Sequence, residues 1–233
     1  MGEWSSYAIA DFLPYDRETA YRLMELANAH LWPLHLLGIV FALMVARAVW
    51  RPGAVPVRQA AAAVALAWLV LALGFIASEL APLLWVGSWL AGAAAAFALL
   101  PLSIALRMPR TPAAWSPGSL TRRAALALLI WALIGHPLLG PLVARRSWAG
   151  LEWFAVAPAP TALATLALAV VCPPVQALML APGPLVWFML AGASSYALGA
   201  VEVQISLAVA LLLLLIAIAA RAADQRTGPR ASP

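Results

Sequence analysis

The stretch VQISLAVALLLLLIAIAA, residues 203–220, contains no charged side chain and no proline. About 20 helical residues cross the roughly 30 Å hydrocarbon core of a bilayer, so this stretch predicts a transmembrane helix. Other uncharged stretches precede it along the chain, at 26–46, 59–78, 80–106, 124–144 and 153–201. The sequence therefore predicts a polytopic membrane protein.

Composition supports the same class. Of 233 residues, 65% are hydrophobic and only 10% are charged, whereas soluble domains carry roughly a quarter charged residues. A soluble globule and a disordered chain are both excluded by this balance. The positive charges are all arginines in short segments between apolar stretches. They indicate membrane topology, so we expect the lipid bilayer as partner and no nucleic acid.

The stretch 153–201 is too long for one helix, and its prolines divide it. Pro173, Pro174, Pro182 and Pro184 mark a turn, with a short interfacial helix expected over Val175–Leu180. We therefore expect an all-α bundle of about seven transmembrane helices within 31–221, followed by a short cytoplasmic tail at 222–233. The predicted helices are 31–50, 59–79, 82–106, 124–143, 156–172, 184–200 and 203–221.

The distribution of charges predicts the orientation of this bundle. With seven helices, ten arginines lie on one side and four on the other, while eight of the nine acidic residues lie on the arginine-poor side. The arginine-rich side is normally cytoplasmic. The N-terminus is then outside and the C-terminus inside, and the absence of lysine is typical of a GC-rich bacterial genome. We expect a multi-pass protein of a bacterial inner membrane.

Residues 1–30 form the most polar part of the chain. Asp16 is placed to cap a helix that runs to about His30. Apolar residues recur within it at helical spacing, at Ala20, Leu23, Met24, Ala27 and Leu31. This pattern predicts an amphipathic helix lying on the outer membrane surface ahead of the first transmembrane helix.

Common catalytic motifs are absent from the sequence. It contains no phosphate-binding glycine loop, no H-E-x-x-H, no G-x-S-x-G and no C-x-x-C. The single Cys172 excludes an intrachain disulfide and a cysteine metal cluster. No catalytic residue, metal ligand or cofactor is predicted, and an enzyme is the least favoured class.

Ionisable residues at membrane depth are the strongest functional signal. His35 and His136 lie inside predicted helices, and His136 sits between Gly135 and Pro137, which loosen its helix. We predict an outward-facing polar pocket formed by His35, His136, Glu79, Glu152 and Glu202. In the alternative interpretation each histidine hydrogen-bonds a carbonyl or lies among the headgroups, and the glutamates are solvated loop ends. Histidine with carboxylate also suits a transition metal, but no spacing indicates convergence.

Three blocks of sequence resemble a known family. They are Glu3-Trp4 with Tyr7, Asp11-Phe12-Leu13, Tyr21-Arg22-Leu23, Glu25, Asn28 and Trp32-Pro33; His136-Pro137-Leu138 with Arg145, Trp148, Glu152-Trp153-Phe154 and 157–161; and Pro184–Trp187 with Gly192-Ala193 and Ala197–Gly199. Together they look like domain-of-unknown-function family 6064, small bacterial membrane proteins, over nearly the whole chain. The sequence departs from that family at Ser5 and at Ser78-Glu79-Leu80, where the family is more aromatic.

Two functions compete on this evidence. A small permease or transporter, acting as an oligomer, fits the interrupted helices and the one-sided polar residues. A structural or accessory subunit of a larger membrane complex fits equally well. Small residues recur every four positions at Ser88, Gly92 and Ala96 and at Ala191, Ser195 and Gly199, which we interpret as ordinary helix-packing stripes.

Overall fold

The computed structural model describes residues 14–109 and 117–227, and within these ranges the chain forms helices and connecting loops without strands. The all-α prediction is confirmed. The elements are α1 Arg17–His30, α2 Leu34–Trp50, α3 Ala54–Val70, the π-helical η3 Leu71–Leu80, α4 Gly87–Arg107, α5 Ser119–Ile130, the π-helical η4 Trp131–Gly135, α6 His136–Val143, the 3₁₀ turn η5 Trp148–Gly150, α7 Pro158–Val171, α8 Pro174–Leu180, α9 Pro182–Ala197 and α10 Val201–Thr227.

Five helices of the described ranges are long and apolar enough to cross a membrane, which is compatible with an integral membrane protein. They are Ala54–Leu80, Gly87–Arg107, Ser119–Val143, Pro174–Ala197 and Val201–Arg226. Helices α1 and α2, bent by 94° at the break between them, give a sixth when counted together. The predicted number of seven is therefore approximate.

The predicted fifth transmembrane helix is the one that differs most. It is α7, with only 14 residues, or about 21 Å of helix. Pro158 and Pro160 fix its start, and Pro173 follows its end. Every residue of α7 is buried, because it packs against α2, α3, α5, α9 and α10. It is an internal helix of the bundle.

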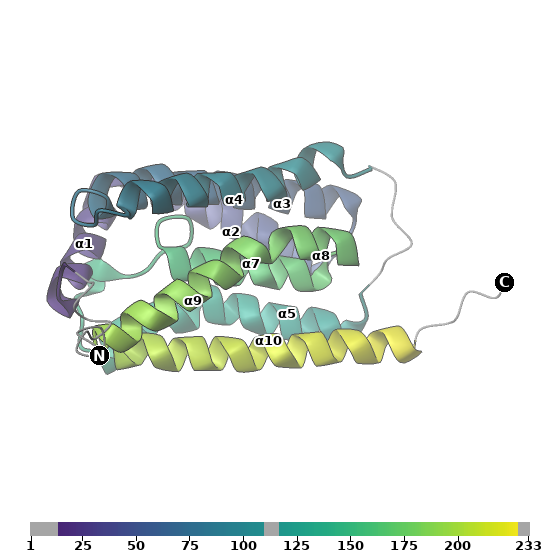
Figure 1. Cartoon of the computed structure of the whole chain (residues 1–233). Coiled ribbons are helices and arrows are strands. Elements are labelled where there is room, and N and C mark those ends of the chain that lie inside the picture. Colours follow the sequence, from purple (N-terminus) through teal and green to yellow (C-terminus); the bar gives the residue numbers. More distant parts are fainter. Residues whose placement is uncertain (1–13, 110–116, 228–233) are drawn as a thin grey trace, which may run out of the picture.

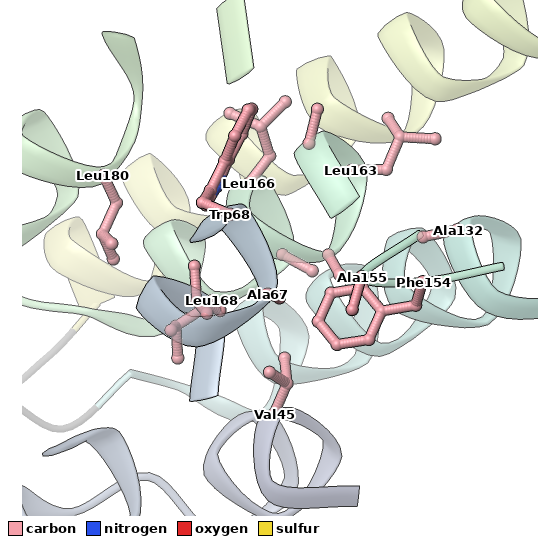
Figure 2. Packing of buried hydrophobic residues seen from close by; sticks show 14 of the residues in the cluster. Val45, Ala67, Trp68, Ala132, Phe154, Ala155, Leu163, Leu166, Leu168 and Leu180 are labelled. Carbon is pink, nitrogen blue, oxygen red and sulfur yellow. The ribbon is translucent and has the colours of Figure 1, made fainter. Parts of the chain in front are cut away.

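The interior is built largely from alanine, valine and leucine. Trp68 of α3 is a large exception, and its indole nitrogen donates to Thr165 Oγ1 of α7 at 3.2 Å. Val45 of α2, Leu163 and Leu168 of α7 and Phe154 lie in the same cluster (Figure 2). Helices in a bilayer gain little from the hydrophobic effect, so close packing of small side chains holds such a core together.

Helix α1 forms as predicted. Asp16 accepts a hydrogen bond from the backbone nitrogen of Thr19 at 2.8 Å and so caps the helix. Leu23, Met24 and Ala27 of its apolar face are buried against the bundle. Figure 1 shows α1 at one end of the long helices, which we call the α1 end. Its place on the outer membrane surface stays a prediction.

At the opposite end, α10 contacts the ends of two other helices. The Asp224 carboxylate accepts from the backbone nitrogen of Thr121 at 3.0 Å, near the start of α5, and from its hydroxyl at 2.5 Å. Arg221 donates to Val170 O at 3.0 Å, near the end of α7. An anion at the start of a helix and a cation at the end of a helix both interact favourably with the helix dipole.

The two small-residue stripes have different environments. In the other stripe, Ser195 is buried, but Gly199 is exposed and a methyl group there would meet nothing within 4 Å, so this stripe packs within the bundle only around Ser195. In α4, Ser88, Gly92 and Ala96 are exposed, and a methyl group on Gly92 would meet nothing within 4 Å. The interpretation as ordinary packing is therefore wrong for α4 within this single chain.

Candidate functional site

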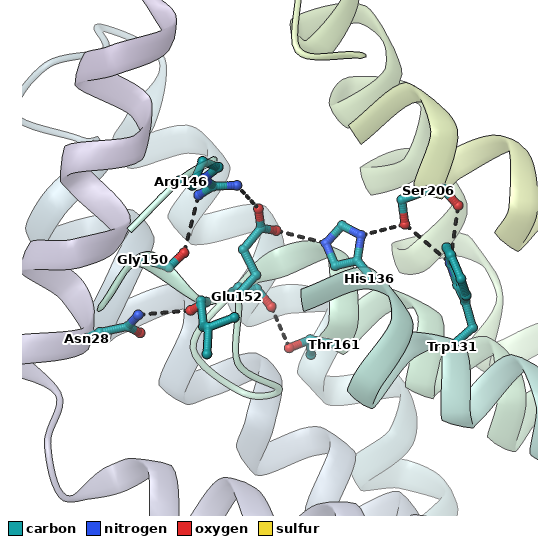
Figure 3. A network of polar contacts seen from close by, with 10 residues as sticks. Asn28, Trp131, His136, Arg146, Gly150, Glu152, Thr161 and Ser206 are labelled. Carbon is teal, nitrogen blue, oxygen red and sulfur yellow. Dashed lines mark hydrogen bonds and ion pairs between the residues drawn. The ribbon is translucent and has the colours of Figure 1, made fainter. Parts of the chain in front are cut away.

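His136 lies at the centre of a polar network at the α1 end (Figure 3). It is the first residue of α6 and is only 5% exposed. Its Nε2 lies 2.9 Å from Glu152 Oε2, and its Nδ1 lies 2.6 Å from Ser206 Oγ on α10. Two residues of the predicted pocket, His136 and Glu152, are thus in direct contact.

The helix around His136 is irregular for a local reason. Pro137 has no backbone N–H to continue the helical ladder, and the preceding turn is the π-helical η4. A side chain on Gly135 would start 2.3 Å from the Trp131 ring, so glycine is needed there. Trp131 Nε1 donates to Ser206 Oγ at 3.2 Å. The irregular turn therefore aims both Trp131 and His136 at Ser206.

Arg146 holds the other oxygen of the Glu152 carboxylate. Its Nη1 donates to Glu152 Oε1 at 3.0 Å, and its Nη2 donates to Gly150 O at 3.2 Å. The guanidinium also lies over the Tyr21 ring, 4.1 Å from the ring centroid, which is a cation–π contact. Because the Arg146 side chain is only 6% exposed, these partners take the place of water in compensating its positive charge.

The electrostatics of Glu152 follow from this arrangement. Burial alone would raise the pKa of Glu152, but His136 and then Arg146 outweigh burial and hold the pKa at about 2. The residue lies in the loop between α6 and α7. It is therefore a carboxylate at any physiological pH, shared between an imidazole and a guanidinium.

This depressed pKa predicts a loss of stability in acid. The stabilisation from Glu152 should be complete above the ordinary carboxyl pKa of 4.5 and should fall as pH drops towards about 2. The thermal midpoint of the purified protein in detergent, followed by circular dichroism, should decline over this window. Glu152→Gln should show a shallower decline, because its side chain cannot ionise. Equal slopes for the two proteins would contradict the prediction.

Asn28 of α1 fixes the position of the loop that carries Glu152. Its Nδ2 donates to Ala149 O at 2.7 Å and to Leu151 O at 2.8 Å, while its Oδ1 lies 3.1 Å from Nε2 of His35. His35 thus contributes through Asn28 and not by direct contact with His136. Asn28 and His35 together anchor the loop to α1 and α2.

Beyond Glu152 the loop enters the bundle without helical structure. Residues 154–157 are buried, and Ala155 has a φ of 70°, which is costly for a residue with a side chain. The backbone nitrogen of Ala155 donates to Thr161 Oγ1 at 2.9 Å. Buried irregular backbone in a membrane bundle needs such internal partners.

The remaining predicted residues lie further from His136. Tyr21 donates from its hydroxyl to Oε1 of the buried Glu202. Burial, together with Glu202, raises the pKa of Tyr21 to about 12, so Tyr21 remains a donor. Glu202 therefore joins the network through Tyr21, which packs under Arg146. Glu79 lies 2.8 Å from His30 in a separate pair and does not join the other four.

A cleft opens beside this network, between α1 and the loop after α6. Its volume is about 230 Å³, and its lining consists of Glu18, Tyr21, Arg22, Glu25, Arg146, Ser147 and Gly150. None of the five predicted residues lines it. Arg146 belongs to both the cleft and the buried network, as do Tyr21 and Gly150, and Arg146 is the one of these three that bonds Glu152 directly. No group of three or more potential metal-ligating residues occurs in the described ranges.

Five residues of the network are not among those that the sequence predicts: Tyr21, Asn28, Trp131, Arg146 and Ser206. In the sequence, Arg146 indicates only membrane topology. Ser206 lies four residues after Glu202 and therefore on the same face of α10. This spacing is the sequence feature that could have indicated Ser206 as part of the site.

Comparison with protein-family profiles, curated proteins and solved structures finds no match for this chain. The fold and the site together define an all-helical protein compatible with membrane insertion, with a polar network at one end. Its function is therefore inferred from the network and the cleft themselves.

Proposed function

We propose that the protein is a small permease of a bacterial inner membrane that receives a polar solute in the cleft beside α1. The observation that carries this proposal is the double role of Arg146. Its side chain lines the cleft and also binds Glu152, which in turn binds the buried His136. Solute arriving in the cleft therefore meets a group that is directly connected to the interior of the bundle.

Two features of the bundle support a transport role. Ionisable side chains at membrane depth are costly and tend to mark ion or substrate pathways, and His136 contacts Ser206 within the apolar helix α10. Interrupted helices and buried irregular backbone are also typical of transporter sites. Here they are η4 and the loop at 154–157. The orientation with the N-terminus outside would make the cleft face the periplasm.

Solute entry into proteoliposomes tests this proposal. Vesicles carrying the protein are placed in iso-osmotic solutions of monosaccharides, monocarboxylates or neutral amino acids, and swelling is followed by light scattering. At least one class should enter faster than into protein-free vesicles, and Ser147→Arg, which fills the cleft, should abolish the difference. Arg226→Ala, at the exposed far end of α10, serves as the control. No excess entry for any class would overturn the proposal.

The exposed stripe on α4 favours a second function, that of an accessory subunit. A helix with Ser88, Gly92 and Ala96 on one open face allows a neighbouring transmembrane helix to approach closely. If this face binds another helix, Gly92→Phe should lower the molecular mass of the detergent-extracted particle. An unchanged particle would remove the support for this alternative.

A further inference from the structure

In the buried network, the Glu152 carboxylate bonds two basic side chains, those of His136 and Arg146. Glu152 presents Oε2 to His136 and Oε1 to Arg146. When the imidazole of His136 is neutral, the negative charge of Glu152 balances Arg146 alone. When the imidazole is protonated, the same charge is divided between two cations. The guanidinium is then less strongly held and is more available to another anion.

Ser206 lets His136 hold a proton without losing a hydrogen bond. In the neutral state Nε2–H donates to Glu152, and Nδ1 accepts from the Ser206 hydroxyl. On protonation Nδ1–H donates to Ser206 Oγ, which also accepts from Trp131. The serine proton can turn to a carbonyl one helical turn earlier in α10. Both protonation states therefore have satisfied partners at this buried position.

The charges of the cleft indicate the kind of solute that fits it. Arg22 and Glu25 are paired at 2.7 Å. The remaining charged lining residues are Glu18 on α1 and Arg146 on the loop, which have opposite signs. A simple anion would face Glu18, and a simple cation would face Arg146. A small molecule with one ammonium and one carboxylate group satisfies both.

We propose that the cleft binds a small zwitterion, of the amino-acid type, together with a proton on His136. The inference rests on the proposed permease function and names its solute. The solute carboxylate takes the place of Glu152 at Arg146, and its ammonium group faces Glu18. Hydronium in the bulk solvent supplies the proton and is left as water; the proton adds to the lone pair of His136 Nδ1, which faces Ser206 Oγ. The positive charge of the imidazolium then compensates Glu152 through Nε2–H.

Linkage makes the coupling reciprocal. A solute that draws Arg146 away from Glu152 favours protonation of His136, and protonation favours the solute by the same factor. The charged and titratable groups around His136 are Glu152 and Arg146 from the loop and Glu202 from α10, the last through Tyr21 of α1. The adjoining segment η4 carries none. Glu152 is therefore the group through which the proton acts.

Ligand-dependent stabilisation of the whole protein in detergent tests the solute class. The probe is an equimolar mixture of L-alanine, L-serine, L-leucine and L-phenylalanine. Their methyl esters lack the carboxylate charge, and their N-acetyl derivatives lack the ammonium charge. Only the free amino acids should raise the thermal midpoint. Equal effects of all three mixtures, or none from the free amino acids, would overturn the proposal.

The proton is tested with two matched histidine variants. In the wild-type protein the apparent affinity for the amino-acid mixture should be about fivefold or more tighter at about pH 5.5 than at about pH 8. His136→Gln, which keeps a donor and an acceptor, should bind with no such pH dependence. His30→Gln, at the same end but in the separate pair with Glu79, should behave as the wild type. Persistence of the pH dependence in His136→Gln would overturn the coupling.

Entry of sugars alone into vesicles would defeat this inference and leave the permease proposal standing, whereas binding without any entry would defeat the permease proposal.

Discussion

Replacing Glu152 with alanine should destabilise the protein by about 3–5 kcal/mol, the cost of removing one partner from a buried ion pair. Arg146, with a side chain only 6% exposed, would keep its positive charge and lose its counter-ion. His136 would lose the acceptor at Nε2. We expect a large fall in the folded yield after detergent extraction and in the thermal midpoint, measured by size-exclusion chromatography and circular dichroism.

Two variants serve as controls for that experiment. Glu152→Gln keeps a side chain that can bond both neighbours and should lose less stability than alanine. Glu79→Ala removes a carboxylate at the same end, but its partner His30 is 63% exposed and can turn to water. That change should cost less than about 1 kcal/mol. Equal losses for Glu152→Ala and Glu79→Ala would show that the network contributes no special stability.

Replacing Gly38 with alanine should also be strongly destabilising. The added methyl carbon would lie 2.8 Å from the backbone oxygen of Phe154, and a backbone atom cannot turn aside as a side chain can. Phe154 is held in place because its neighbour Ala155 is hydrogen-bonded to Thr161. Overpacking of this kind costs about 1–3 kcal/mol. The thermal midpoint should fall, and the labelling of a cysteine placed at Ser147 should change as the loop shifts.

Gly92 provides the matched control for Gly38. Both are glycines within helices, but a methyl group at Gly92 meets nothing within 4 Å. Gly92→Ala should leave stability unchanged or raise it by up to about 1 kcal/mol, through helix propensity. If the two alanine variants melted at the same temperature, the close approach of α2 to the loop would have no energetic importance.

Most of the helices could be predicted because charge and proline mark their limits directly. The uncharged stretches 59–78 and 80–106 correspond to α3 with η3 and to α4. The helix α7 was harder, since an apolar segment inside a bundle and one that crosses a bilayer have the same composition. Its 14 residues fall short of the bilayer core, and only the surrounding prolines indicated this.

The candidate site could be predicted only in part. Its position inside a predicted helix marks His136 as unusual, and the sequence places Glu152 at the same outer boundary; the structure brings the two into contact. Which partners they choose depends on contacts between residues far apart in the chain, which helical periodicity does not encode. Hence Glu79 was grouped with His35, although it pairs with His30 of α1.

The contacts of α10 at both ends of the bundle also bear on how the protein is made. It follows every other described helix in the chain, so it is synthesised after them. Before it arrives, His136 lacks Ser206 and the start of α5 lacks Asp224. Nascent chains arrested ahead of α10 would therefore lack these hydrogen-bond partners, and insertion of this one helix completes both ends of the bundle.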